Sequence, residues 1–413
     1  MAEKIIFKRE NRVELGTVEG DVEIDHCDYL VPQQGNEIVI TGTLTIRGET
    51  TVQGSLRVDR LEAKTSDRIT IEGDLYADKS AIVKRGSLVV EGSAKARDIR
   101  ADGSLKVGKD LVCITGTGGG SIKVGGNAKA QRLNGGGSVK IEGNAEVSEI
   151  SAGGSAVVRG QIKCQEMKVG GSGKCNTGTI ALVNIGGSFK SEGAVDIEEI
   201  DVGGSTVVGP GSKVGTVDVG GSFKSLGDVT FGDIDVGGAV KFAGTATGES
   251  IDVGGSLKVD GDLNLSEDLD VGGKVSVEGN IKCEKKIKVG GVITATGRIE
   301  SFRIIVGGRI EADYIKAHNG FRVGRRSEVI GFVESEEILV RERGRTETLY
   351  GDNIRIEDRA RIKNIYGREI YLEREVVVEG EVLYTESIEM EDGVKIGKGP
   401  DKVDKLPPPE DLN

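Results

Sequence analysis

An apolar pair recurs every six residues through most of this chain, and that spacing constrains the fold more than any other feature. Residues 256–273, SLKVDGDLNLSEDLDVGG, divide into three sixes that have large apolar residues only at their second and fourth positions. Alternation with a period of two places both apolar side chains on one face of a strand and the residue between them on the other. Each six therefore predicts one short strand followed by a polar turn.

Three sixes form a longer repeat, which is marked by the tripeptide VGG or IGG. In its most regular part this tripeptide begins at positions 169, 185, 202, 219, 236, 253, 271, 289 and 306. Repeats of this kind are typical of solenoids, in which each coil completes the core of its neighbours. Glycine at this density disfavours helix, because each interior glycine costs a helix about 1 kcal/mol. We therefore predict an all-β, triangular β-solenoid with about 17–18 residues per coil.

The six-residue pattern starts near residue 38, in IVITGTLTIRGETTVQGSLRV, and ends near residue 396, which predicts about 20 coils. We expect one continuous solenoid over residues 36–396, less regular at 340–375, where glycine becomes rarer and tyrosines appear. Residues 1–35 carry weak strand signals and are expected to form an N-terminal arm or cap. Residues 397–413 include three consecutive prolines and no apolar period, so we expect a flexible tail there.

The net charge and the hydropathy of the chain argue against nucleic acid as a partner and against a membrane span. The formal net charge of −12 argues against nucleic acid, because phosphate binding requires clustered lysine and arginine. No apolar run approaches the roughly 18–20 residues that span a membrane, and the charged start MAEKIIFKRENRVELG does not resemble a secretory signal. A cytoplasmic location is therefore expected.

The five cysteines include no CxxC spacing and are interpreted as small buried thiols.

Candidate catalytic residues are scarce. The chain has two histidines, His26 and His318, and only His318 lies within the repeats, without a surrounding motif. Hexapeptide-repeat acyltransferases have a similar period but carry one large aliphatic residue per six, whereas this chain carries two. The glycine-rich stretches at 114–130 and 133–143 match no phosphate-binding motif and lead into no helical pattern. We expect no enzyme activity and no cofactor.

One ordered polar feature is a column of aspartates. The residue before each VGG lies between two inward side chains, so it points outward, and over five successive coils it is aspartate: Asp201, Asp218, Asp235, Asp252 and Asp270. Their mutual repulsion in water is only about 1 kcal/mol per neighbouring pair, which is tolerable without a metal. A cation-binding column is therefore a weak alternative. A lysine column, Lys190, Lys224, Lys241 and Lys258, is expected on another side.

The joints between the six-residue sides resemble those of one known family. IVITGTLTIRGETTVQGSLRV, LVVEGSAKARDI and SVEGNIKC are similar to the repeats of bactofilins, the polymer-forming cytoskeletal proteins. This resemblance implies a single-stranded right-handed parallel β-helix that assembles end to end into filaments without nucleotide. The right hand also follows the general rule for parallel crossovers.

Unpaired ends give a second reason to expect polymerisation. The last coils of a solenoid expose apolar side chains and strand edges, which pair with another copy unless they are capped. Candidate contacts are Ile38, Ile40, Leu44 and Ile46 near the N-terminal end, and Val376, Val378, Val382, Val394 and Ile396 near the C-terminal end. We therefore expect a non-enzymatic homopolymer that could bind other proteins along its sides. The alternative is a discrete, capped scaffold whose charged columns bind a partner or cations.

Overall fold

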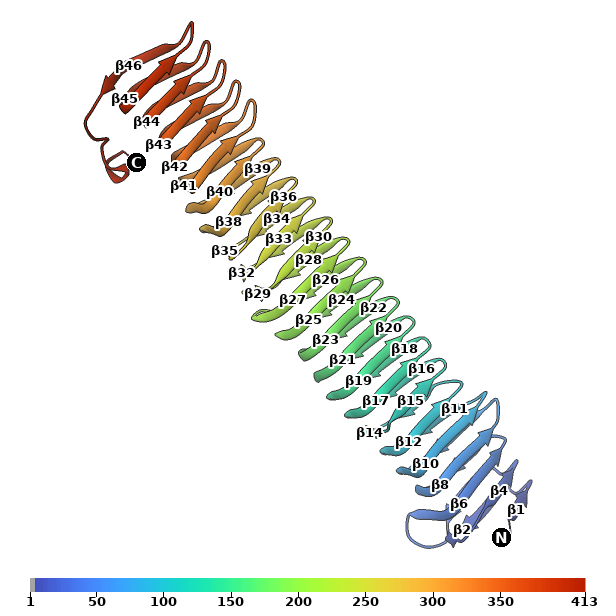
Figure 1. Cartoon of the computed structure of the whole chain (residues 1–413). Helices are drawn as coiled ribbons and strands as arrows, with labels where there is room; N and C mark the ends of the chain where they lie inside the picture. The colour runs from blue at the N-terminus through green and yellow to red at the C-terminus, as the bar shows by residue number, and fades with distance from the viewer. Residues whose placement is uncertain (1–3, 413) are drawn as a thin grey trace. The chain divides into compact units, whose positions relative to one another are not determined.

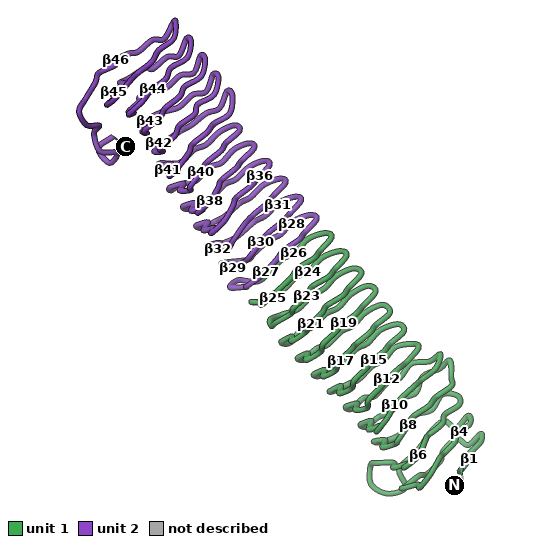
Figure 2. Tube along the Cα trace, viewed as in Figure 1, with its two compact units in different colours: residues 1–208 green, residues 209–413 purple. Residues whose placement is uncertain are grey.

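The computed structural model describes residues 4–412, and strands make up 69% of it. The strands pair in parallel and form a β-solenoid of about 23 turns, which confirms the predicted fold class. Among the described residues the only helical element is a short 3-10 turn, η1 (Pro409–Asp411). The chain divides into two compact units, residues 1–208 and 209–413 (Figure 2), and each is a stack of parallel coils (Figure 1).

Unit 1 contains 26 strands. In chain order they are β1 (Ile5–Lys8), β2 (Arg12–Leu15), β3 (Thr17–Val18), β4 (Val22–Asp25), β5 (Tyr29–Pro32), β6 (Glu37–Arg47), β7 (Thr50–Val52), β8 (Ser55–Lys64), β9 (Arg68–Ile71), β10 (Leu75–Lys84), β11 (Ser87–Val90), β12 (Ala94–Ala101), β13 (Leu105–Val107), β14 (Leu111–Val112), β15 (Thr115–Gly118), β16 (Ser121–Val124), β17 (Ala128–Gly135), β18 (Ser138–Ile141), β19 (Ala145–Ala152), β20 (Ser155–Val158), β21 (Gln161–Val169), β22 (Ser172–Cys175), β23 (Thr177–Ile185), β24 (Ser188–Ser191), β25 (Val195–Val202) and β26 (Ser205–Val208).

Unit 2 contains the remaining 20 strands. They are β27 (Ser212–Val219), β28 (Ser222–Ser225), β29 (Val229–Phe231), β30 (Asp233–Val236), β31 (Ala239–Phe242), β32 (Ala246–Gly248), β33 (Ser250–Val253), β34 (Ser256–Val259), β35 (Leu263–Leu265), β36 (Asp268–Val271), β37 (Lys274–Val277), β38 (Ile281–Val289), β39 (Val292–Ala295), β40 (Arg298–Val306), β41 (Arg309–Val323), β42 (Glu328–Val340), β43 (Arg345–Ile356), β44 (Arg361–Leu372), β45 (Val377–Met390) and β46 (Lys395–Lys402).

Each six-residue segment of the sequence forms one side of a coil. The three sixes of residues 256–273 become β34, β35 and β36, which pair in parallel with β31, β32 and β33 of the preceding coil. Both apolar residues of each six point into the core and are at most 3% exposed: Leu257, Val259, Leu263, Leu265, Leu269 and Val271. The predicted alternation therefore holds on all three sides of this coil.

At two places in the core a glycine makes room for a phenylalanine of a neighbouring coil. Gly173 occupies an inward position, where an added Cβ would lie 2.3 Å from Ile185 Cδ1 and 3.4 Å from Phe189 Cδ2. In unit 2, a Cβ on Gly248 would lie 2.1 Å from Phe231, whose ring stacks on Phe242 at a centroid distance of 5.5 Å. Because interiors pack to a fixed density, the Phe189 and Phe231 rings each fill the space left by a glycine in a neighbouring coil.

Asparagine and aspartate side chains connect the coils at the corner that follows the first side. In unit 1, Asp110 Oδ1 accepts the N–H of Asn127 at 2.7 Å, and Asn127 Oδ1 accepts the N–H of Asn144 at 2.9 Å. In unit 2, Asp262 Oδ1 accepts the N–H of Asn280 at 2.7 Å. These bonds satisfy backbone donors at a turn, where the strand ladder is interrupted.

The coils after residue 309 use a different corner. Strands β41 to β45 run for 12 to 15 residues, and the turn between successive strands contains a residue in the left-handed region: Arg326, Arg343, Arg359 and Glu375, with φ between 56° and 60°. Their N–H groups donate to the next coil, as from Arg343 to Asp358 O at 2.9 Å. This tight turn replaces the glycine pair and accounts for the lower regularity seen in the sequence at 340–375.

Candidate self-association surfaces

The N-terminal edge of unit 1 is formed by β1, β2 and β3, which pair on one side only within residues 4–208. Ile5 and Arg9 donate their N–H groups to Asp21 and Asp25 of the next coil, at 3.0 and 2.8 Å. In a parallel ladder the alternate N–H groups, those of Ile6 and Lys8, therefore point toward the open side. This edge is apolar as well as unpaired, since Ile5 is 40% and Ile6 is 50% exposed.

The C-terminal edge of unit 2 has a different character. Its last strand, β46, pairs with β45 and has the sequence KIGKGPDK. Lys398 forms an ion pair with Glu381 of β45, and the three lysines of β46 are exposed. Lysine, glycine and proline on an edge strand oppose pairing with another chain. The two terminal edges are therefore unequal, one apolar and the other charged.

The structure places the predicted contact residues at different depths. Ile38, Ile40, Leu44 and Ile46 lie in β6, which pairs with β3 and β4 on one side and β8 on the other, and all four are at most 1% exposed. At the other end Val376, Val378 and Val382 are also at most 1% exposed. Val394 and Ile396 are half-buried, and Ile396 pairs with Val378. Of the nine residues, Val394 and Ile396 are the nearest to a terminal edge.

The sequence pattern missed the outermost coil because its repeat step is irregular. Ile5 pairs with Val22, one ordinary coil length further along the chain, but Val22 pairs with Leu44, which is a longer step. The extra residues form the turn after β5, around Gly35. A search for IIFK and VEID as two sides separated by one ordinary coil would have placed the first coil correctly.

The predicted aspartate column is present within unit 2. Parallel pairing places Asp218, Asp235, Asp252 and Asp270 opposite one another, and Lys288 follows in the next coil. Lys288 Nζ lies 2.6 Å from Asp270 Oδ2, and this hydrogen bond raises the pKa of Lys288. In unit 1, Asp201 pairs with Asn184. Within residues 4–412, no group of three or more histidine, cysteine or acidic side chains is arranged to hold a metal ion.

The lysine column lies on a different side of unit 2. Lys224, Lys241 and Lys258 are opposite one another in β28, β31 and β34. Ion pairs with Asp260 and Glu278 raise the pKa of Lys258. Neighbouring acids therefore neutralise part of this column, which reduces its attraction for an anionic partner.

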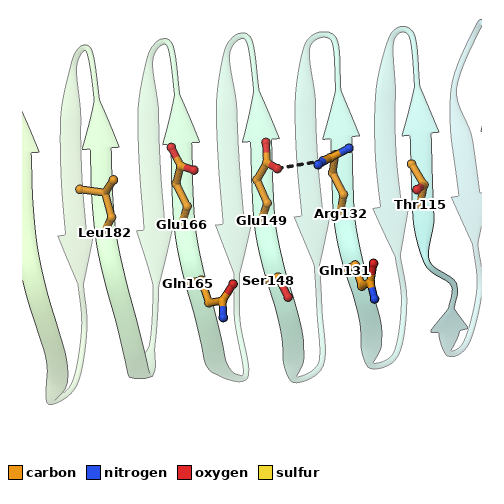
Figure 3. A pocket seen from close by; sticks show the side chains of 8 residues that line it. All are labelled: Thr115, Gln131, Arg132, Ser148, Glu149, Gln165, Glu166 and Leu182. Carbon is orange, nitrogen blue, oxygen red and sulfur yellow. Dashed lines mark hydrogen bonds and ion pairs between the residues drawn. The ribbon is translucent and has the colours of Figure 1, made fainter.

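A groove of about 550 Å³ lies on the side of unit 1, where the strands bend (Figure 3). Figure 3 shows the eight residues that line it: Thr115, Gln131, Arg132, Ser148, Glu149, Gln165, Glu166 and Leu182. Arg132 Nε lies 2.8 Å from Glu149 Oε2 and forms an ion pair with it. The lining contains no histidine and no cysteine.

The histidines and cysteines form no joint site among the described residues. His26 Nδ1 lies 2.8 Å from Asp25 Oδ1, and His318 Nε2 lies 2.9 Å from Glu300 Oε1, both at the surface. All five cysteines are buried and free, as expected. Burial raises the pKa of the Cys113 and Cys175 thiols to about 12 and that of Cys164 to about 11, which keeps them protonated and unreactive.

A comparison with known protein families bears on this arrangement of stacked coils. Residues 251–350 match the bactofilin family, described as polymer-forming cytoskeletal. The resemblance expected from the repeats is thereby confirmed for this part of the chain. No curated protein and no solved structure matches the chain.

The bactofilin match covers β34 to β42 and parts of β33 and β43, all of which lie within unit 2. It includes Asp252, Asp270 and Lys288 of the charged column, and coils with both kinds of corner. The family is a structural one, and the predicted solenoid and polymer-forming class agree with it. A search of residues 4–412 finds no helix with the length and apolar character needed to cross a membrane.

Proposed function

We propose that this protein is a non-enzymatic cytoskeletal element that self-assembles end to end, without nucleotide, into filaments in the cytoplasm. In this proposal the solenoid is continuous over residues 36–396, and other proteins bind along its sides. The observation that carries the proposal is the unpaired apolar edge of β1 with exposed Ile5 and Ile6. The bactofilin match over residues 251–350 supports the polymer-forming class.

The contact would combine strand pairing with apolar burial. A strand edge that carries free N–H and C=O groups is a template for another strand, and the exposed isoleucines add area removed from water. Contacts of this kind are insensitive to salt, whereas association of oppositely charged surfaces weakens as ionic strength rises. Salt dependence therefore separates end contacts from lateral association.

A capped, discrete scaffold is the second candidate, and the lysine-rich β46 edge favours it. If the opposite edge is also inactive, the protein would remain as single solenoids and would act through its charged side columns. Such a scaffold would bind a partner or cations without forming polymers.

Negative-stain electron microscopy of the full-length chain, without nucleotide and at low and high salt, separates the two candidates. We expect filaments at both salt concentrations. Isolated solenoids under every condition would contradict the filament proposal and favour the scaffold. Filaments that disappear at high salt would instead indicate charge matching.

A pair of variants tests the contact itself. Ile5→Lys combined with Ile6→Lys should shorten or abolish the filaments, because it places charges on the apolar edge. Phe302→Lys is the matched control, since Phe302 is also 50% exposed but lies on the side of the solenoid. Filaments that survive the double change but are lost with Phe302→Lys would place the contact on the side.

A further inference from the structure

The C-terminal segment returns along the side of unit 2 (Figure 1). Val403 donates its N–H to Tyr384 O of β45 at 2.9 Å, and Pro409 lines a cavity together with Arg298 of β40 and Tyr314 of β41. From β45 to β41 is four coil steps, or about 19 Å at the strand spacing. Six residues of polyproline II helix also span about 19 Å. Pro408 has φ −58° and ψ 143°, which is this conformation.

The surface that faces this segment is aromatic. The Tyr314 and Phe332 rings stack at a centroid distance of 5.5 Å, and the Tyr350 ring lies 6.2 Å beyond Phe332. The Arg298 guanidinium lies 5.2 Å from the Tyr314 centroid, and the Tyr314 hydroxyl donates to Glu334. With the segment in place, Tyr314 and Tyr350 are half-buried and Phe332 is 3% exposed. Rows of fixed aromatic rings bind proline-rich segments, since the polyproline helix is already ordered before binding.

The partly buried residues of the segment are all apolar. Leu406, Pro407, Pro409 and Leu412 are half-buried, whereas Pro408, Glu410 and Asp411 are exposed. Burial and the Glu334 carboxylate raise the pKa of both Tyr314 and Tyr350, and the Glu410 carboxylate adds a smaller contribution in the same direction. The described backbone hydrogen bonds of Asp411 and Leu412 stay within the segment, to Pro408 and Pro409. Apolar contact rather than strand pairing therefore holds the segment beyond Val403.

Open cavities border the segment. One of about 660 Å³ is lined by Pro409 and Tyr314, and one of about 810 Å³ is lined by Leu412, Phe332 and Thr348. Because both are open to solvent, the segment covers only part of the adjoining surface, and uncovered surface forfeits dispersion contacts. The segment is therefore held weakly enough to be displaced.

We propose that Tyr314, Phe332 and Tyr350 form a binding site for a short proline-containing segment, and that Leu406–Leu412 occupies it in cis as an exchangeable ligand. The site recognises a polyproline II turn flanked by leucines. This proposal concerns the side of unit 2 and does not depend on filament formation.

A labelled peptide tests the site in the full-length chain. The triple variant Pro407→Ser, Pro408→Ser, Pro409→Ser should loosen the docked C-terminal segment and expose the aromatic site. A fluorescein-labelled peptide with the sequence of residues 403–412 should then bind this variant at least about tenfold more tightly than the unmodified chain, where the tethered segment competes. Fluorescence anisotropy measures both affinities, and a peptide with serine at the three prolines should bind neither protein.

Side-chain changes on the solenoid locate the site. Tyr314→Ser added to the triple variant should abolish peptide binding, and Phe332→Ser should do the same. Tyr371→Ser is the matched control, because Tyr371 also lies under an arginine, Arg355 at 5.2 Å, but on a different side of the coil. Circular dichroism confirms that each variant is folded. Absence of peptide binding to the triple variant, or binding that Tyr314→Ser leaves unchanged, would overturn the proposal.

Proteolysis of the unmodified segment gives an independent readout. Trypsin cleaves after Lys405, directly before the docked residues, and docking should protect this bond. Tyr314→Ser should therefore accelerate the cleavage several-fold, while Tyr371→Ser should leave its rate unchanged. Equal rates in all three proteins would show that the segment is not held by the aromatic surface.

Discussion

Gly255 and Gly273 occupy the same corner of successive coils, so close together that a Cβ on Gly273 would lie 2.3 Å from the carbonyl oxygen of Gly255. The same close approach recurs along the stack. A Cβ on Gly255 would lie 2.2 Å from the carbonyl oxygen of Gly238, and a Cβ on Gly291 would lie 2.4 Å from that of Gly273. Side chains cannot enter this corner, because coil stacking brings the backbones together there. The repeated VGG is therefore a requirement of coil spacing.

Alanine at this corner should destabilise the solenoid. We expect Gly273→Ala to lower the free energy of unfolding by about 1–3 kcal/mol, since the added methyl group meets a rigid backbone oxygen. Gly320→Ala is the control, because the only close atom is Arg303 Nε at 3.8 Å. The free energy of unfolding of this control variant should stay within about 0.5 kcal/mol of that of the unmodified chain. Urea unfolding followed by circular dichroism compares the two, and equal losses would contradict the close-approach explanation.

Charges introduced at Leu44 and Ile46, two of the predicted contact residues, should destabilise the fold itself and not only the assembly. Leu44→Lys combined with Ile46→Lys places two charges in a core where both residues are 0% exposed, so we expect a loss of more than about 3 kcal/mol. Ile6→Lys, at a 50% exposed edge position, should change stability by less than about 0.5 kcal/mol. Thermal unfolding distinguishes them. A folded Leu44→Lys, Ile46→Lys protein of normal stability would contradict the observed burial.

Neutralising the aspartate column should not weaken the protein. Asp235→Asn and Asp252→Asn each remove repulsion between neighbouring coils, so we expect a melting temperature that is unchanged or slightly higher at low salt. The gain should disappear at high salt because of screening. Asp270→Asn is the control, since it also removes the 2.6 Å ion pair with Lys288 and should give no gain. A large loss of stability that only calcium reverses would instead establish a cation site.

The buried thiols should be silent until the chain unfolds. With pKa values of about 12 for Cys113 and Cys175 and about 11 for Cys164, almost no thiolate exists at pH 8, and access is blocked as well. We expect slow reaction with a disulfide reagent in buffer and rapid reaction of all five thiols in denaturant. Fast labelling of any thiol in buffer would indicate local opening of its coil.

The same shifts predict how stability depends on pH. The folded pKa values exceed the ordinary thiol value of 9.0, so above pH 9 the unfolded chain loses thiol protons that the folded chain retains. This contribution is fully present below pH 9 and is lost as the pH rises toward 12. Cys175→Ala should reduce the loss between pH 9 and 11, as measured by urea unfolding.

Local periodicity explains why much of the fold could be predicted. An apolar pair two residues apart must point to one face of a strand, and a polar turn every six residues must bend the chain, whatever lies further along it. The alternation therefore predicted the burial of the pairs Leu257/Val259 and Leu263/Leu265. The outward column of Asp218 to Asp270 followed from the same alternation.

The terminal coil and the aromatic surface beside the C-terminal segment could not be predicted in this way. The turn around Gly35 lengthens one coil, and an insertion of this kind hides the pairing of Ile5 with Val22 from any fixed-period search. As a result, Ile5 and Ile6 were not recognised as the exposed edge. The aromatic surface of Tyr314 and Phe332 was equally hidden, since its rings come from successive coils, on β41 and β42.

The sequence by itself determined the all-β solenoid, the length of its coils and which side chains face inward, because these depend on neighbours within a few residues. Only the tertiary structure decided which coil is outermost, which glycine accommodates which phenylalanine, and where residues 406–412 lie. Those properties depend on register between coils and on contacts between distant residues. Local alternation carries no information about either.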